Sequence, residues 1–262
     1  MTRVRLDQLL VGRGLAPSRA AAQALLLAGE VDLAGAGSRT LKPGHLVDPD
    51  VGLSVVARDR WASRAGAKLE AALDAFAIIP SGMACLDAGA STGGFTDVLL
   101  ARGARVVYAV DVGRGQLVDR LARDPRVVSM ERTNLRTLGS LPEQIELATL
   151  DLSFISLRLV LPAVHGLLAE AGRVIALVKP QFEAGRGAVP RGGVVRDRAT
   201  HRAVLVQLAE DATREGFSPM ALIGSPILGA DGNREFLALL AKGREAAPGW
   251  GAQLDAVAPS AV

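Results

Sequence analysis

Residues 86–97 read LDAGASTGGFTD, and this stretch decides the fold that the chain predicts. The apolar run 83–86 leads into an acidic residue, a turn with three glycines and a helical pattern that continues to residue 102. Further apolar runs follow at 105–110, 127–130, 145–150 and 173–178, mostly with helical patterns between them. Apolar strands that alternate with helices are typical of a parallel sheet covered on both faces. The sequence therefore predicts an α/β domain built on a Rossmann-like, doubly wound and mostly parallel sheet.

The chain has 262 residues, enough for one large domain and a small companion. Residues 1–58 predict a small α+β domain, with a pair of short helices followed by short strands. Residues 59–64 are the expected linker, and residues 65–244 the large α/β domain. The tail 245–262 is rich in Ala, Pro and Gly and is expected to be flexible.

Composition restricts the class of protein. Apolar residues make up 49% of the chain and charged residues 22%, as in a soluble globular protein. The single cysteine, Cys85, excludes an intramolecular disulfide framework and a cysteine-rich zinc site, and it suits a reducing cytosol. The N-terminus lacks the features of a signal peptide, and no run approaches about 18 apolar residues, so no membrane span is expected. No ligand cluster indicates a metal.

The glycine turn has the wrong pattern for two common ligands. A dinucleotide fingerprint needs G-x-G-x-x-G, but Ser91 stands at the second glycine position. A triphosphate-binding loop needs a lysine after its last glycine, where this chain has Phe95. Asp87 also disfavours a pyrophosphate. The glycine cluster alone would equally suit an ordinary strand-to-helix turn.

S-adenosylmethionine fits the turn better, because its sulfonium and amino groups are cationic and its ribose hydroxyls donate to carboxylates. Asp111 follows the run 105–110 and lies 111 − 87 = 24 residues after Asp87, close to the spacing of ribose-binding acids in such sheets. Ligands bind beyond the carboxyl ends of the strands. We therefore expect cofactor contacts from the turn and the strand-end carboxylates: Asp87, Gly89, Ser91, Thr92, Gly93, Gly94, Phe95, Thr96, Asp111 and Asp151.

The absence of two motifs restricts which kind of atom can accept the methyl group. Methylation of a planar base nitrogen usually uses an Asn/Asp-Pro-Pro-aromatic tetrapeptide, but residues 151–154 read DLSF. Methylation of a base carbon needs a cysteine nucleophile at a strand end, whereas Cys85 lies inside the first strand. An alcohol acceptor is left, and a hydroxyl must lose its proton as it attacks. The reaction then needs a general base.

Lys179 is the candidate for that base. It closes the apolar run 173–178, is fixed by Pro180, and lies beside Asp151 on the previous strand. A lysine accepts a proton when burial and a neighbouring cation lower its pKa, and Lys68 is a candidate for that cation. Taken singly, Lys68 also suits a solvated helix position, and Asp151 suits a helix cap.

The chain resembles a known family along nearly its whole length. Its catalytic part is similar to the successive motifs of the TlyA family of ribosomal RNA 2′-O-ribose methyltransferases, with an FtsJ-like catalytic domain, in SRAGAKL, LDAGASTGGFTD, LDLSFISL, LVKPQFE and GNREF. The N-terminal RLDQLLVGRGLAPSRAAAQALLLAGEVDLAG resembles the family's small RNA-binding domain, named after a small-subunit ribosomal protein. The resemblance implies a class I methyltransferase fold with S-adenosylmethionine as cofactor. It also implies a cytoplasmic enzyme that methylates a ribose 2′-hydroxyl of ribosomal RNA, within ribosomal subunits.

The resemblance assigns roles to residues as well. The family's Lys-Asp-Lys-Glu set falls on Lys68, Asp151, Lys179 and Glu235. Lys179 takes the proton-abstracting role, while the other three orient it, tune its charge and position the ribose. Asn134 is similar to a residue at the adenine and ribose end of the cofactor pocket.

Basic residues indicate where RNA would bind. The net charge of +3 equals that of the first 25 residues, where four arginines accompany one aspartate. Phosphate contacts supply affinity, while folded RNA is read largely by shape. The expected contacts come from this helix pair, its neighbouring turn and a later glycine-rich loop: Arg3, Arg5, Arg13, Arg19, Lys42, Arg186 and Arg191. Two alternatives stay open, a non-catalytic RNA-binding or ribosome-assembly factor and a membrane-active haemolysin, a label also attached to this family.

Overall fold

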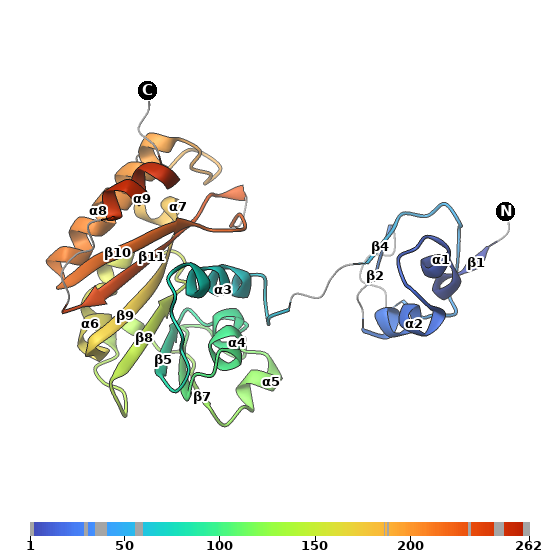
Figure 1. Cartoon of the computed structure of the whole chain (residues 1–262), viewed down its shortest axis with the longest axis horizontal. Helices are drawn as coiled ribbons and strands as arrows, with labels where there is room; N and C mark the ends of the chain where they lie inside the picture. The colour runs from blue at the N-terminus through green and yellow to red at the C-terminus, as the bar shows by residue number, and fades with distance from the viewer. Residues whose placement is uncertain are drawn as a thin grey trace. The chain divides into compact units, whose positions relative to one another are not determined.

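The computed structural model describes residues 3–28, 31–34, 41–55, 60–185, 187, 189–229, 232–243 and 249–258. The chain divides into two compact units, Met1–Arg60 and Trp61–Val262 (Figure 1). The division falls within the linker expected at 59–64. Trp61 is 8% exposed and packs with the core of the second unit, so the large unit begins at this residue.

The N-terminal unit is a small α+β fold. Its elements are β1 (Val4–Arg5), α1 (Leu6–Gly12), α2 (Arg19–Ala28), β2 (Val31–Leu33), β3 (Leu46–Val47) and β4 (Leu53–Val55). β1 pairs with β3 and β2 with β4, both antiparallel. The helices pack through Leu6, Leu10 and Leu26, each at most 3% exposed. α2 begins where the Ser18 hydroxyl accepts a hydrogen bond from Ala21 N at 3.2 Å, an N-cap arrangement.

The second unit is built on a seven-stranded sheet of order β10-β11-β9-β8-β5-β6-β7. Its strands are β5 (Ala84–Ala88), β6 (Val106–Val110), β7 (Val127–Met130), β8 (Ile145–Leu150), β9 (Leu168–Val178), β10 (Phe217–Gly224) and β11 (Phe236–Lys242). Strands β5 to β9 pair in parallel, and β11 runs antiparallel between β9 and β10. The chain builds outward from β5 to β7 and then adds β8 and β9 on the other side of β5. Such sheets bind ligands at the carboxyl ends of the strands where the order reverses.

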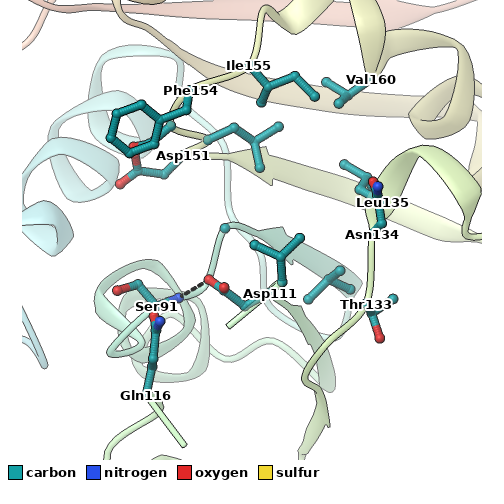
Figure 2. Close-up of a pocket in the computed structure, with 15 residues that line it drawn as sticks. Ser91, Asp111, Gln116, Thr133, Asn134, Leu135, Asp151, Phe154, Ile155 and Val160 are labelled. Carbon is teal, nitrogen blue, oxygen red and sulfur yellow. Dashed lines mark hydrogen bonds between the residues drawn. The ribbon is translucent and has the colours of Figure 1, made fainter. Parts of the chain in front are cut away.

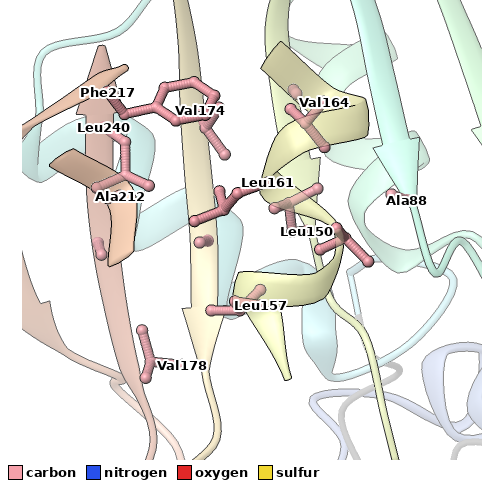
Figure 3. Close-up of a cluster of buried hydrophobic side chains, with 14 of the residues drawn as sticks. Ala88, Leu150, Leu157, Leu161, Val164, Val174, Val178, Ala212, Phe217 and Leu240 are labelled. Atoms are coloured by element: carbon pink, nitrogen blue, oxygen red, sulfur yellow. The ribbon is translucent and has the colours of Figure 1, made fainter. Parts of the chain in front are cut away.

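Helices cover both faces of this sheet (Figure 1). They are α3 (Ala65–Ala75), α4 (Gly94–Ala101), α5 (Asp119–Ala122), α6 (Leu161–Leu167), α7 (Pro180–Glu183), α8 (Arg198–Arg214) and α9 (Trp250–Val257), with 3-10 turns η1 (Leu135–Thr137) and η2 (Leu157–Leu159). On β9, Val174 and Val178 join the core under α6 and α8 (Figure 3), whereas Ile175 and Leu177 join the core under α3 and α4. This alternation of apolar side chains is what a sheet buried on both faces requires.

The boundary between α6 and β9 differs from the sequence expectation. The pattern at 157–169 predicts one helix, but α6 ends at Leu167 and β9 begins at Leu168. Leu168 pairs with Ile145 of β8. A short run of leucine and alanine suits a helix and a strand alike, and here the pairing with β8 decides.

The prediction of a flexible tail at 245–262 is wrong for residues 250–257. These residues form α9, which packs on β10 through Leu254, only 5% exposed. Gln253 Oε1 also accepts a hydrogen bond from Leu222 N at 2.7 Å. The Ala-rich and Gly-rich composition conceals an apolar stripe at Trp250, Leu254 and Val257, whose spacing is that of one helix face.

Candidate active site

The glycine turn after β5 needs glycine for its conformation and its packing. Gly89 has φ +84° and Gly93 has φ +98°, a region that side-chain-bearing residues rarely adopt. An ideal Cβ on Gly89 would lie 2.4 Å from the carbonyl oxygen of Asp151. Asp151 N in turn donates to Ala88 O at 2.9 Å. The ends of β5 and β8 are thereby held together where the strand order reverses.

Asp87 lies beneath this turn. Its side chain is fully buried and accepts hydrogen bonds from Thr96 Oγ1 at 2.6 Å and Thr149 Oγ1 at 3.2 Å. Burial raises the pKa of Asp87 to about 6, and the hydrogen bond from Thr96 opposes that rise. Asp87 therefore supports the turn from within. A cavity described next lies beside this turn. Six of the expected cofactor-contacting residues do not line it: Asp87, Thr92, Gly93, Gly94, Phe95 and Thr96.

A cavity of about 370 Å³ opens at the carboxyl ends of β5, β6 and β8 (Figure 2). Five of the expected residues line it: Gly89, Ser91, Asp111, Asn134 and Asp151. Asp111 accepts hydrogen bonds from Ser91 N at 2.8 Å and from Gly113 N at 2.7 Å, one on each oxygen. A carboxylate has about four lone-pair sites, so both oxygens keep capacity for a ligand. Asn134 Oδ1 accepts from Arg136 N at 3.0 Å, and its amide group is left to donate.

Sequence reasoning missed the apolar part of this cavity. Leu135, Ile155 and Val160 line it, together with Gln116 and Thr133. Single apolar residues in loops have no pattern of their own. Only their position after the strands β7 and β8 could have indicated them.

A second cavity, of about 580 Å³, brings together all four residues of the expected Lys-Asp-Lys-Glu set. Lys68 comes from α3, Asp151 follows β8, Lys179 follows β9 and Glu235 precedes β11. Lys179 Nζ lies 2.7 Å from Asp151 Oδ1. Lys68 Nζ lies 2.5 Å from Glu235 Oε2. Both lysines and Glu235 are buried, and their pairing offsets the cost of burying charge.

Lys179 has a further partner that sequence reasoning missed. Its Nζ donates to Ser153 Oγ at 3.0 Å. An ammonium group has three donors, so one is left for a ligand in the cavity. Ser153 belongs to the DLSF tetrapeptide, which was its only signal. Lys68, the predicted neighbouring cation, lines the same cavity as Lys179 and is paired with Glu235.

The two cavities share a wall. Asp151, Ser153 and Phe154 line both of them. Phe154 is 91% exposed, and its ring centroid lies 5.0 Å from that of Phe182. A group held in the first cavity can therefore meet an acceptor held in the second one, next to Lys179. An exposed aromatic ring at the shared wall suits stacking by a planar base.

The N-terminal unit carries five of the expected RNA-contacting residues, all exposed or half-buried: Arg3, Arg5, Arg13, Arg19 and Lys42. Arg13 donates to the carbonyl oxygens of Pro49 at 2.5 Å and Val51 at 2.7 Å, so its guanidinium ties α1 to that turn. Arg191 is exposed in the loop before α8. Arg186 lies outside the described residues.

Other chemistries find no support in the described part of the chain. Cys85 is buried inside β5, and burial raises its pKa to about 12, which makes it a poor nucleophile. Among the residues placed by the structure, no three His, Cys, Asp or Glu side chains cluster as metal ligands. Each helix in the described ranges is too short or too polar to cross a membrane.

Comparison with known proteins gives a consistent family. The FtsJ-like methyltransferase family matches residues 61–242. The 16S/23S rRNA (cytidine-2′-O)-methyltransferase TlyA of Mycobacterium tuberculosis is 46% identical over 258 residues, which cover 93% of this chain and 95% of that protein. YqxC of Bacillus subtilis, named as an rRNA methyltransferase, is 47% identical over 89% of this chain and 84% of its own.

Solved structures agree with this assignment. A hemolysin-named protein from Streptococcus thermophilus superposes with a TM-score of 0.76 and 42% identity, covering 98% of this chain and 95% of that one. The family match spans the whole sheet and all four residues of the Lys-Asp-Lys-Glu set. The chain belongs to the FtsJ-like methyltransferase family.

Proposed function

We propose that the chain transfers a methyl group from S-adenosylmethionine to a ribose 2′-hydroxyl of ribosomal RNA, with Lys179 as the general base. One observation carries the proposal. Lys179 Nζ is held between Asp151 and Ser153 at the wall that joins the two cavities. The names of the M. tuberculosis and B. subtilis relatives support ribosomal RNA as substrate.

The residues of the first cavity fit S-adenosylmethionine. Asp111 has free acceptor sites for ribose hydroxyls, and the Asn134 amide can donate to a ring nitrogen. The apolar side chains of Leu135, Ile155 and Val160 suit an adenine ring. When bound, the cofactor supplies an electrophilic methyl group on a cationic sulfonium.

The residues of the second cavity provide for the acceptor. A ribose hydroxyl is a weak acid and gives up its proton as its oxygen attacks, so a base within hydrogen-bond reach is needed. Lys179 in its neutral form takes this proton at Nζ, and the oxygen forms the new bond to carbon while the sulfur–carbon bond breaks. Asp151 and Ser153 fix the position of Nζ.

The Lys68–Glu235 pair lines the same cavity, with Lys68 on α3 and Glu235 just before β11. Its groups hold each other in place, and they offer a donor and an acceptor to the ribose. Much of the barrier to methyl transfer lies in aligning the three reacting atoms. We assign this pair to positioning the ribose. The reaction would take place in the cytoplasm, where ribosomal subunits are found.

Radiolabelled methyl transfer tests the proposal. Small and large ribosomal subunits, purified from bacteria that lack this protein, are incubated separately with the chain and labelled S-adenosylmethionine. Nuclease digestion then locates the label. We expect it on a 2′-oxygen of one or a few nucleotides. Measurable cofactor binding without label on either subunit or on naked ribosomal RNA would contradict the proposed substrate and favour a non-catalytic RNA-binding factor or another alcohol as acceptor.

A further inference from the structure

A fully buried carboxylate lies in the N-terminal unit, in a part of the chain that the methyl-transfer chemistry does not use. Asp7 is 0% exposed, in the first turn of α1. It accepts two hydrogen bonds from Arg5, Nε to Oδ1 at 3.0 Å and Nη2 to Oδ2 at 2.9 Å. Arg19 Nε donates to Oδ2 at 2.9 Å, and Gln23 Nε2 donates to the same oxygen at 3.1 Å. One carboxylate thus joins the start of α1 to α2.

The neighbouring donors favour the charged form of this carboxylate. The hydrogen bonds from Arg5 hold the pKa of Asp7 well below its usual range, and those from Gln23 and Arg19 act in the same direction. Two arginines and one aspartate leave the cluster with one net positive charge.

Among the residues that the structure describes, most N–H donors of Arg5 and Arg19 have no hydrogen-bond partner. A guanidinium has five N–H donors, and Asp7 takes two from Arg5 and one from Arg19. The two side chains are 38% and 53% exposed, so donors are available to a group outside the protein. Arg5 Nη1 also lies beside Gly44, 3.4 Å from an ideal Cβ there. It therefore borders the turn that carries the exposed Lys42.

We propose that Asp7 is a positioning residue for RNA binding, which fixes Arg5 and Arg19 as one clamp for the phosphate backbone of folded RNA. The inference rests on the proposed function. Guanidinium groups bind phosphate through paired hydrogen bonds of defined geometry. Side chains that are already held in the binding geometry lose less conformational freedom when RNA binds. Arg13, whose guanidinium is occupied by backbone carbonyls, does not belong to the clamp.

The positioning role and simple charge attraction predict opposite effects of Asp7→Asn on RNA affinity. Asp7→Asn removes a negative charge next to the clamp, so attraction to a polyanion alone would tighten binding. If Asp7 positions the arginines, the same change weakens binding although the net charge rises. Asp32→Asn is the matched control, because Asp32 is exposed on β2 in the same unit and the substitution changes the charge equally.

Equilibrium binding of the full chain to purified bacterial ribosomal subunits, small and large measured separately, tests this at several KCl concentrations and constant magnesium. For the subunit that the wild-type chain binds, we expect Asp7→Asn to raise Kd about tenfold. The slope of log affinity against log salt should fall by about 0.7–0.9, the contribution of one phosphate contact. Asp32→Asn should bind as tightly as wild type or slightly more tightly. S-adenosylmethionine binding should be the same in all variants.

Two substitutions keep the charge and cover the case in which Asp7→Asn fails to fold. Arg5→Lys retains a cation but cannot form the paired hydrogen bonds with the carboxylate, and Arg19→Lys retains a cation but loses the planar guanidinium that Asp7 holds through Nε. Each should weaken binding several-fold. Two results would overturn the role of Asp7 and leave the proposed function intact. One is a folded Asp7→Asn chain that binds as tightly as Asp32→Asn, and the other is Arg→Lys variants that bind like wild type. A wild-type chain that binds neither subunit would overturn the proposed function itself.

Discussion

Replacing Asp87 with Asn should change how the stability of the catalytic unit varies with pH. Burial raises the pKa of Asp87 to about 6 in the folded chain, against an ordinary value of 3.8. As pH rises, the unfolded chain loses this proton first. Between about pH 4 and pH 6 the unfolded chain therefore binds fewer protons than the folded chain, so stability falls through this window and is level above it.

The size of the effect follows from the two pKa values. The difference between about 6 and 3.8, at about 1.4 kcal/mol for each pKa unit, amounts to about 3 kcal/mol. Asn is neutral at every pH, and its amide can accept from the Thr96 hydroxyl and donate to that of Thr149. Most of this difference develops between pH 4 and pH 7, so the free energy of unfolding of Asp87→Asn, relative to wild type, should rise by about 2 kcal/mol or more across this range.

Urea unfolding followed by tryptophan fluorescence measures this, because both tryptophans, Trp61 and Trp250, lie in the second unit. The curves are recorded from pH 4 to pH 7 for wild type and variant. Asp119→Asn is the control, since that side chain is 89% exposed and its difference from wild type should not vary with pH. A constant difference between Asp87→Asn and wild type would refute the reasoning.

Three other perturbations test separate parts of the site. Asp111→Ala should weaken S-adenosylmethionine binding roughly ten- to hundredfold in calorimetry, since hydrogen bonds to a charged group contribute about 1.5–3 kcal/mol; unchanged affinity would remove Asp111 from the pocket. Gly89→Ala should lower the free energy of unfolding by about 2 kcal/mol or more, because its φ is +84° and its Cβ would meet a carbonyl oxygen at 2.4 Å. Gly166→Ala, exposed in α6 with open space around it, should instead raise that free energy by about 0.5–1 kcal/mol. Lys68→Met should cost about 3–5 kcal/mol by leaving Glu235 buried without its partner, and a second change of Glu235→Leu should recover part of the loss in urea unfolding.

The sequence predicted the sheet well because its signal is local. Each of the parallel strands contains a short apolar run, and the glycine turn at 86–97 marks the first strand end where the order reverses. Chain order then places Asp111 and Asp151 at the same edge. The meeting of Lys68 with Glu235 needed the family resemblance, because these residues are 167 positions apart and a single charge before a strand has no distinctive pattern.

The parts that sequence could not predict depend on which face a side chain occupies or on tertiary packing. Asp87 is expected at the cofactor site, and the sequence did not indicate that the alternation along β5 directs its carboxylate toward Thr96 and Thr149 in the core. The pairing of Lys179 with Ser153 arises from the path of the loop after β8. Tertiary packing also decides α9, whose few apolar residues are buried only because the helix packs on β10.

The rate of a single turnover by Lys179→Arg tests the central claim most directly. Arginine keeps the positive charge and can pair with Asp151, but it cannot accept a proton. At saturating S-adenosylmethionine and ribosomal subunits, the rate of 2′-O-methylation should fall by about 10²–10⁴-fold, the usual contribution of a general base. Lys242→Arg, which changes a lysine at the end of β11 that lines neither cavity, should react at the wild-type rate. Loss of methylation by Lys179→Arg with unchanged binding of cofactor and subunits is the predicted result, and a rate within a few-fold of wild type would contradict Lys179 as the base.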